Sequence, residues 1–505
     1  MRTIVHILLI LTLWGSAKSK EDRYHDLTLQ GIEYAYNLDV DKATLIFDKI
    51  IKFDPNNPHG YVLQSVNYFY RLQFEDSGEE YEKRFKKYAV QAVKLSKKLL
   101  ANQAKKLDAL FYLGTIHMYL AAYHVSQNNW IRAYWYGKDG IAYLQKVVGI
   151  NPNYYDAYLG LGLYHYYADV MPKFVKTVSV ILGIEGDRKR GLRELQIAGE
   201  KGKYSRAEAL FFLGNIYLFT ENEYELALAC SRKLTRLYPK GFLLFHGEAL
   251  QKNGHHAEAA AVFNRAILEN NSSRFPFFTI WSRFLLGNIY FEMNQFPDAI
   301  EQFQQASALA AKSSDKIKWV LAWSNFKIAE CYDMMQQPKR AGSFYRKVKK
   351  SEHKRAHKQA QERLKKPLLK AELDLTFGHN YFKQKDFDRA IEIYQAVLTK
   401  AARDLPDYPA RKIPEIQHHI GKALFEKKEV SDAVFILSKV ITTQKVQEKW
   451  VKPWCHYYLG KCYSASGEIR KAKEHFKLAS KFNDNRLRFV IEKARDALAS
   501  NVMKN

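Results

Sequence analysis

Residues 284–306 read FLLGNIYFEMNQFPDAIEQFQQA, and the spacing inside this stretch decides the fold. With Gly287 as the reference, Tyr290 follows by three residues, Ala299 by twelve and Phe303 by sixteen. Steps of three and four place side chains on one stripe of a helix, so the stretch predicts two short amphipathic helices. Small residues at the reference position and at plus twelve allow the two helices to approach closely, and the ring at plus sixteen fills the space between them.

The same spacing recurs along most of the chain, at about eleven sites between residues 24 and 484. Further clear reference positions are Gly31, Gly247, Ala329, Gly378, Gly421 and Gly460. Gly114 and Gly162 head units with histidine in the tyrosine slot, and after Gly214 the second helix comes one residue late. The pattern resembles the tetratricopeptide repeat (TPR) family, whose unit has about 34 residues. This resemblance implies an all-α fold, an α-solenoid of antiparallel helix pairs that forms a right-handed superhelix.

The N-terminus has the order of a secretory signal. Arg2 precedes an apolar run over residues 4–14, and small residues lead to Ala17. We expect residues 1–17 to be a signal peptide cleaved after Ala17, with a retained anchor as the alternative. No later segment approaches the ~20 apolar residues of a membrane span. The protein is therefore expected to be exported, either periplasmic or peripherally associated with the envelope, with secretion as the alternative.

The repeats divide into two expected arms. Residues 18–348 form an N-terminal arm, 349–367 a basic connecting helix, and 368–505 a C-terminal arm that ends in a capping helix. An amphipathic insert at 168–190 interrupts the fourth unit, and it either packs on the solenoid, lines a ligand pocket or lies on a membrane surface.

The segment around this insert has a looser second resemblance. It reads GLGLYHYY at 160–167, MP at 171–172 and GIEGDRKRGL at 183–192. In these residues it is similar to the tetratricopeptide repeat protein 39 / inclusion-body-clearance family.

Part of the net charge of +26 falls in one stretch, and the remainder is spread along the chain. Residues 339–366 hold twelve Lys or Arg against two Glu. Four of the basic residues follow at four-residue steps, which predicts one helical face: Arg346, Lys350, Lys354 and Lys358. This face is either a solvated connecting helix or a docking surface for an anionic partner.

No catalytic motif, cofactor motif or metal-ligand spacing is present in the sequence, so we expect a protein that is not an enzyme. His117, His124, His165 and Asp169 form a weaker candidate cluster, better explained by packing. His255 and His256 are expected to be solvated in a polar turn. The four cysteines do not have the spacing of a disulfide framework, so we expect structural thiols.

The TPR resemblance implies a binding groove lined by first-helix residues three before, one after and four after the reference position. We call these the groove slots. The candidate groove residues are Phe211, Asn215, Phe284, Asn288, Phe291, Phe326, Phe382, Phe425 and Tyr457. Among the others in these slots are Glu330, Leu375, His379, Lys422 and Lys461. Large rings with few polar groups suit a peptide or an apolar ligand, unless curvature of the array buries them.

These features predict a non-enzymatic, extracytoplasmic scaffold or adaptor that binds protein or peptide segments in its concave groove, in cell-envelope assembly or maintenance. The alternative is peripheral attachment to an anionic membrane or polymer surface through the basic segment 339–366. No cofactor and no nucleic acid partner are expected.

Overall fold

A computed structural model describes residues 20–74, 78–170, 186–270, 276–313, 317–444 and 446–482, together with 494, 497 and 498. The expected signal peptide, the centre of the insert at 168–190 and most of the expected capping helix lie outside these residues. Of the C-terminal segment, Ala494 is buried against the cluster of Ala472, Phe476 and Ala479.

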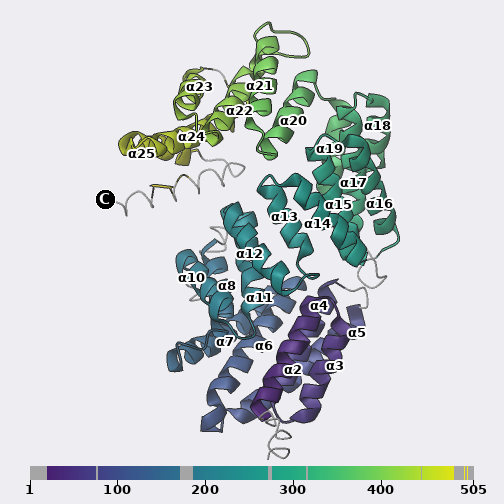
Figure 1. Ribbon diagram of the computed structural model, residues 1–505, viewed down its shortest axis with the longest axis vertical. Helices are drawn as coiled ribbons and strands as arrows, with labels where there is room; N and C mark the ends of the chain where they lie inside the picture. The colour runs from purple at the N-terminus through teal and green to yellow at the C-terminus, as the bar shows by residue number, and fades with distance from the viewer. Residues whose placement is uncertain are drawn as a thin grey trace, which may run out of the picture. The chain divides into compact units, whose positions relative to one another are not determined.

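The described residues contain 23 α-helices, and most follow one another as packed pairs, such as α2 with α3 and α20 with α21 (Figure 1). The first half comprises α2 (Lys20–Tyr36), α3 (Val40–Phe53), α4 (Pro58–Phe74), α5 (Gly78–Leu99), α6 (Lys106–Ser126), α7 (Trp130–Ile150), α8 (Ala157–Val170), α10 (Arg188–Lys201), α11 (Arg206–Ile216), α12 (Tyr224–Leu237) and α13 (Leu243–Lys252). The second half comprises α14 (His256–Glu269), α15 (Pro276–Glu292), α16 (Phe296–Ala311), α17 (Lys318–Met334), α18 (Pro338–Lys347), α19 (Lys354–Lys365), α20 (Lys370–Lys383), α21 (Phe387–Ala401), α22 (Ile413–Glu426), α23 (Val430–Thr442), α24 (Val451–Ala465) and α25 (Ile469–Ser480). The all-α class expected from the sequence is confirmed.

The chain divides into two compact units, described separately below. The first comprises Met1–Ala249 and Arg265–Phe278, and the second comprises Leu250–Asn264 and Thr279–Asn505. The division falls within residues 250–279, whereas the sequence placed the joint between two arms at 349–367.

Several pairs close through the contact that the spacing predicts. A Cβ atom added to Gly287 would lie 2.7 Å from Cε1 of Phe303, and one added to Gly460 would lie 2.6 Å from Cε1 of Phe476. Both rings are buried. The reference glycine is therefore required because the aromatic ring of the second helix occupies the place of its side chain.

The first helix of most pairs ends in a left-handed residue seven positions after the reference. These residues have φ between 55° and 83°, and they are Leu38, Gly254, Asn294, Gln336, Lys385, Lys428 and Gly467. Left-handed backbone just after a helix satisfies the last carbonyl groups and turns the chain into the next helix. Only two of the seven are glycine, so residue type alone did not reveal this position.

The one-residue delay after Gly214 has a direct structural cause. Tyr217–Glu221 form a π-helical turn, which holds one residue more per turn than an α-helix. The left-handed residue that follows is Asn222, eight positions after the reference instead of seven.

The basic segment is not the single helix that the sequence predicted. α18 ends at Lys347, residues 348–353 are not helical, and α19 begins after His353, whose side chain accepts a hydrogen bond from the Ala356 amide. Val348 is buried together with Ala356 and Ala360 of α19. Burial of this apolar face against α17 and α18 turns the chain between the two helices, so the four-residue step cannot continue across the break.

No described helix has both the length and the apolar character that crossing a membrane requires.

Candidate functional site

The groove slots contain two kinds of side chain. Phe284, Phe291 and Phe326 are buried, with 7%, 9% and 4% of their surface exposed. Their assignment as open groove residues is therefore corrected. Phe284 stacks on Trp281 with ring centroids 5.3 Å apart, and Phe326 meets Trp323 at 5.5 Å. The tryptophan three positions earlier covers each of these two rings, a contribution that slot counting omits.

The remaining predicted groove residues are half-buried: Phe211, Asn215, Asn288, Phe382, Phe425 and Tyr457. Asn215 donates a hydrogen bond from its side chain to the Phe211 carbonyl on its own helix, 2.7 Å away. Its amide group is therefore partly engaged within α11.

Two of the half-buried rings are each paired with a lysine of the next first helix. Lys422 of α22 lies 4.3 Å from the centroid of Phe382, and Lys461 of α24 lies 4.4 Å from that of Phe425. A cation over an aromatic face is attracted by the ring quadrupole. Burial lowers the pKa of Lys422 to about 8, with Glu426 opposing the shift and Lys461 and Lys383 adding to it.

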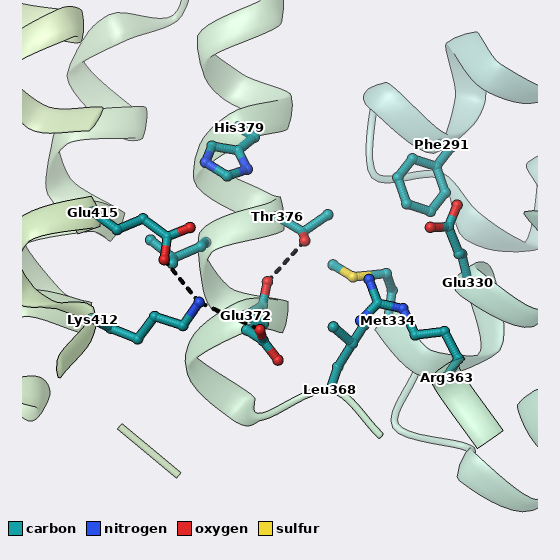
Figure 2. A pocket seen from close by; sticks show the side chains of 11 residues that line it. Phe291, Glu330, Met334, Arg363, Leu368, Glu372, Thr376, His379, Lys412 and Glu415 are labelled. Atoms are coloured by element: carbon teal, nitrogen blue, oxygen red, sulfur yellow. Dashed lines mark hydrogen bonds and ion pairs between the residues drawn. The ribbon is translucent and has the colours of Figure 1, made fainter. Parts of the chain in front are cut away.

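A pocket of about 180 Å³ opens between first helices of the second unit (Figure 2). Four groove-slot residues line it: Phe291, Glu330, Leu375 and His379. Other lining residues come from outside the slots: Met334, Arg363, Leu368, Glu372, Thr376, Lys412 and Glu415. Residues as far as 124 positions apart in the sequence, Phe291 and Glu415, thus meet at one site, which we call the charged pocket.

Lys412 lies among three carboxylates in one wall of the charged pocket. Its Nζ lies 2.8 Å from Glu415, 3.5 Å from Glu372 and 3.6 Å from Glu448. Burial alone would lower the pKa of Lys412, but the hydrogen bond to Glu415 and the surrounding carboxylates outweigh it and raise the pKa. This wall carries more negative than positive charge.

The opposite wall carries Glu330 and Arg363, and Figure 2 shows them on the other side of α20 from Lys412 and Glu415. Lys327 pairs with Glu330 at 2.7 Å. Within the described ranges, Arg363 has no carboxylate oxygen within 4 Å of its guanidinium. Its donors are therefore available to a bound group.

His379 is the polar side chain between the walls. Its Nε2 is buried and has no hydrogen-bond partner among the residues that the structure describes. Burial lowers the pKa of His379 to about 4, and Lys383 and Lys422 add to the effect. A neutral imidazole can donate or accept one hydrogen bond, and a buried polar atom left unbonded is costly. The charged pocket therefore offers a free hydrogen-bonding position next to charges of both signs.

Two histidines of the predicted cluster, His117 and His165, are buried and hydrogen-bonded within the chain. His117 bonds the Leu113 carbonyl at 2.7 Å, and His165 bonds Glu194 at 2.5 Å. The expectation that His256 is solvated is wrong: it is buried, and its Nε2 lies 3.0 Å from Glu292. In the described part of the chain, no group of three or more His, Cys, Asp or Glu side chains is arranged to hold a metal ion.

The cysteines behave as the sequence predicted. Cys230, Cys331, Cys455 and Cys462 are all free and buried.

The basic residues Arg346, Lys350, Lys354 and Lys358 are all exposed. They do not share one helical face, because the first belongs to α18, the second to the break and the last two to α19. Lys358 lies 4.0 Å from Glu362 on its own helix.

Arg363, Lys412 and Glu415 were missed by the sequence analysis. Arg363 comes from α19, which belongs to no regular pair, and Lys412 from the short turn before α22. Repeat spacing carries no information about either position.

The fold is that of a helical-repeat protein, and side chains of its first helices line the charged pocket. Residues 207–240, which cover α11 and α12, match the family model described as Tetratricopeptide repeat. The family model thus identifies one tetratricopeptide repeat in the chain, and the spacing described above recurs in other helix pairs.

The solved structures that match this chain share little sequence with it. Yeast Tom70 is 13% identical, with a TM-score of 0.27, over 96% of this chain and 98% of that one. A tetratricopeptide repeat protein from Parabacteroides merdae is 15% identical, with a TM-score of 0.24, over 59% and 98%. The TPR2AB domain of yeast Sti1, from its complex with pHSP90, is 15% identical, with a TM-score of 0.23, over 59% and 99%. No curated protein sequence matches this chain.

Proposed function

We propose that this chain is a non-enzymatic scaffold that binds a segment of a partner protein across α20, α22 and α24, with the charged pocket as its anchor point. The proposal rests on the unpartnered Nε2 of His379 inside a pocket built from groove-slot residues of successive first helices. A volume of about 180 Å³ suits one side chain of a partner, and the neighbouring first helices provide the surface for the rest of the segment.

The charges define the partner segment further. Lys422 lies over the ring of Phe382, and Lys461 lies over that of Phe425. Among the described residues, the carboxylate within 4 Å of either ammonium group is that of Glu426, 3.8 Å from Lys461. An acidic side chain crossing α22 and α24 would pair with these ammonium groups. The segment is therefore expected to be acidic there and to place a polar side chain beside His379 and Arg363.

Site-specific photocrosslinking tests this function. A photoreactive phenylalanine analogue at position 382 should capture one defined partner segment from native extract, whereas the same analogue at the exposed Phe435 of α23 should not. With the purified partner, Phe382→Ala should weaken binding by about tenfold or more. Equal capture at both positions, or unchanged affinity of the Phe382→Ala protein, would refute the proposal.

We also propose that the protein is exported and acts in cell-envelope assembly or maintenance. Support comes from the charged start, apolar run and small residues of residues 1–17. N-terminal sequencing of protein made in its native host should find a mature chain that begins at Lys18. An intact Met1 on protein recovered from the cytosolic fraction would contradict export.

A second candidate is attachment to an anionic surface through the basic segment. The exposure of Arg346, Lys350 and Lys354 favours it. Sedimentation with vesicles of phosphatidylglycerol should then fall steeply between low and physiological salt, because screening shortens to about 8 Å. Sedimentation that is insensitive to salt, or unchanged by Lys350→Glu with Lys354→Glu, would exclude this role.

A further inference from the structure

The first unit contains a larger cleft that the proposed function does not use. It has a volume of about 640 Å³ and is lined where the first helices α2, α4, α6, α8 and α11 begin, by their opening residues and the turns before them. None of the predicted groove residues lines it. We call it the tyrosine cleft, because five tyrosines line it: Tyr24, Tyr112, Tyr154, Tyr155 and Tyr204.

Three of these rings are held around one buried histidine. The centroid of His59 lies 5.2 Å from that of Tyr24, 5.5 Å from that of Tyr112 and 5.6 Å from that of Tyr204. The hydroxyl of Thr28 bonds His59 Nε2 at 3.0 Å. Burial, with Lys203 nearby, lowers the pKa of His59 to about 4, so the ring is neutral at physiological pH. The aromatic wall is thus uncharged and organised before any ligand arrives.

The wall also carries an unused hydrogen-bonding group. The hydroxyl of Tyr24 is buried and has no partner within the described ranges. A buried hydroxyl without a hydrogen bond is unfavourable, and most buried hydroxyls in proteins have a partner. This hydroxyl can both donate and accept.

The charges in the lining almost balance. The carboxylates are Glu21, Asp54, Asp108 and Asp156, and the lysines are Lys105, Lys201 and Lys203. Lys201 lies over Tyr155 and Lys203 over Tyr204, each 5.3 Å from the ring centroid. A simple anion would meet four carboxylates and a simple cation three ammonium groups, so neither is favoured.

The lining also argues against an apolar ligand or a peptide with apolar anchors. Leu99 is the one aliphatic side chain among the residues that line the cleft. The remaining features are aromatic faces, hydroxyls, carboxylates, amides and ammonium groups. A sugar ring matches this set, because its C–H face packs on an aromatic face while its hydroxyls donate to carboxylates and accept from lysines.

We propose that the tyrosine cleft binds a neutral oligosaccharide. Its volume lies within the usual range for ligand sites of about 300–1,000 Å³ and exceeds the need of a single sugar ring. Asp108 accepts from the sugar hydroxyls, whereas Asp156 Oδ1 already accepts from the amides of Tyr204 and Ser205 and from the Ser205 hydroxyl. Tyr112 and Tyr24 provide the stacking faces, and the buried Tyr24 hydroxyl gains its missing partner.

Calorimetric titration of the full-length protein with cellotetraose, maltotetraose, xylotetraose and chitotetraose tests this site. At least one should bind at concentrations up to about 10 mM. Tyr112→Ala should weaken that binding by about tenfold or more, whereas Tyr134→Ala, a half-buried tyrosine of α7 outside the cleft, should not change it.

Asp108→Asn serves as a second variant in case Tyr112→Ala does not fold. Asp108 is exposed, so its substitution disturbs the packing less than that of Tyr112. It should weaken binding at least threefold, since a charged hydrogen-bond acceptor is lost. No binding by any of the four sugars overturns the proposal. Binding that both cleft variants leave unchanged also overturns it, as does displacement of the sugar by an acidic peptide.

Discussion

The charged pocket of the second unit and the tyrosine cleft of the first are built from the same repeat in different ways. The charged pocket takes Glu330, Leu375 and His379 from the middle of successive first helices, where the repeat also sets the packing. The tyrosine cleft takes its residues from helix starts and the turns before them. The charged pocket is therefore part of the packed structure, whereas the tyrosine cleft combines rings packed around the buried His59 with exposed charged residues such as Asp108 and Lys203. We therefore expect substitutions in the charged pocket to affect stability and substitutions of the exposed cleft residues to have little effect.

The largest effect is expected from Phe291→Ala. Phe291 is buried, lines the charged pocket and packs edge to face on Phe296 with centroids 5.4 Å apart. Truncation of a buried phenylalanine costs about 3–5 kcal/mol. Urea unfolding should show this loss, whereas Phe435→Ala, at a ring that is 59% exposed, should cost less than about 1 kcal/mol. If both substitutions lowered the free energy of unfolding equally, Phe291 would contribute no more to the core than the exposed Phe435.

The next largest effect is expected from acid, which should lower the stability of the second unit. Burial, first of all, lowers the pKa of His379 to about 4 and that of His418 to about 3, and holds that of His419 well below 6.5, with Lys422 adding to each shift. A depressed pKa in the folded state means that the unfolded chain binds more protons. The stability is therefore complete above pH 6.5 and is lost as the pH falls towards 4, by up to about 1.4 kcal/mol per pH unit for each histidine.

Hydrogen exchange at pH 7.5 and pH 5 measures this effect. Protection in α20 and α22 should fall at pH 5, and His418→Asn should reduce the pH dependence. Protection in these helices that is equal at both pH values would contradict the burial of neutral histidines.

Lys412→Met should have an intermediate effect. The substitution leaves Glu372, Glu415 and Glu448 near one another without the ammonium group between them. Removal of one partner from a buried ion pair costs about 3–5 kcal/mol, and the partial exposure of these carboxylates reduces this to about 2 kcal/mol. A thermal melt should show the loss at pH 7 and a smaller loss at pH 4, because burial raises the pKa of Glu415 and favours its protonation in acid. A loss that is the same at both pH values would argue against charge as its cause.

The smallest effect is expected in the tyrosine cleft. Asp108→Asn and Lys203→Ala change exposed side chains and should alter the free energy of unfolding by no more than about 0.5 kcal/mol. Urea unfolding of these two proteins beside Lys412→Met makes the comparison direct. A cost of 2 kcal/mol or more at either cleft position, by the same measure as the pocket variants, would remove the distinction between the two sites.

Repeat spacing predicted the pairs and their close contacts well, because Gly287 with Phe303 and Gly460 with Phe476 are local consequences of helix geometry. Repeat spacing also placed His379 and Glu330 in groove slots, and both line the charged pocket. It failed at Phe284 and Phe326, where a tryptophan one turn earlier covers the ring.

Repeat spacing could not predict other features of the two sites. Arg363 and Lys412 reach the charged pocket from positions outside any slot. The tyrosine cleft is lined at the starts of five first helices. The spacing of residues along the sequence does not show that these helix starts lie close together.

The unpaired helix α19 has a consequence for the ancestry of the molecule. Copying a whole two-helix unit adds helices two at a time, so a single helix between α18 and α20 cannot descend from such a copy alone. It requires a separate insertion, or the loss of a partner helix. Arg363 of the charged pocket comes from this helix. Duplication thus produced the array, and a departure from duplication supplied one of the side chains that distinguish its pocket.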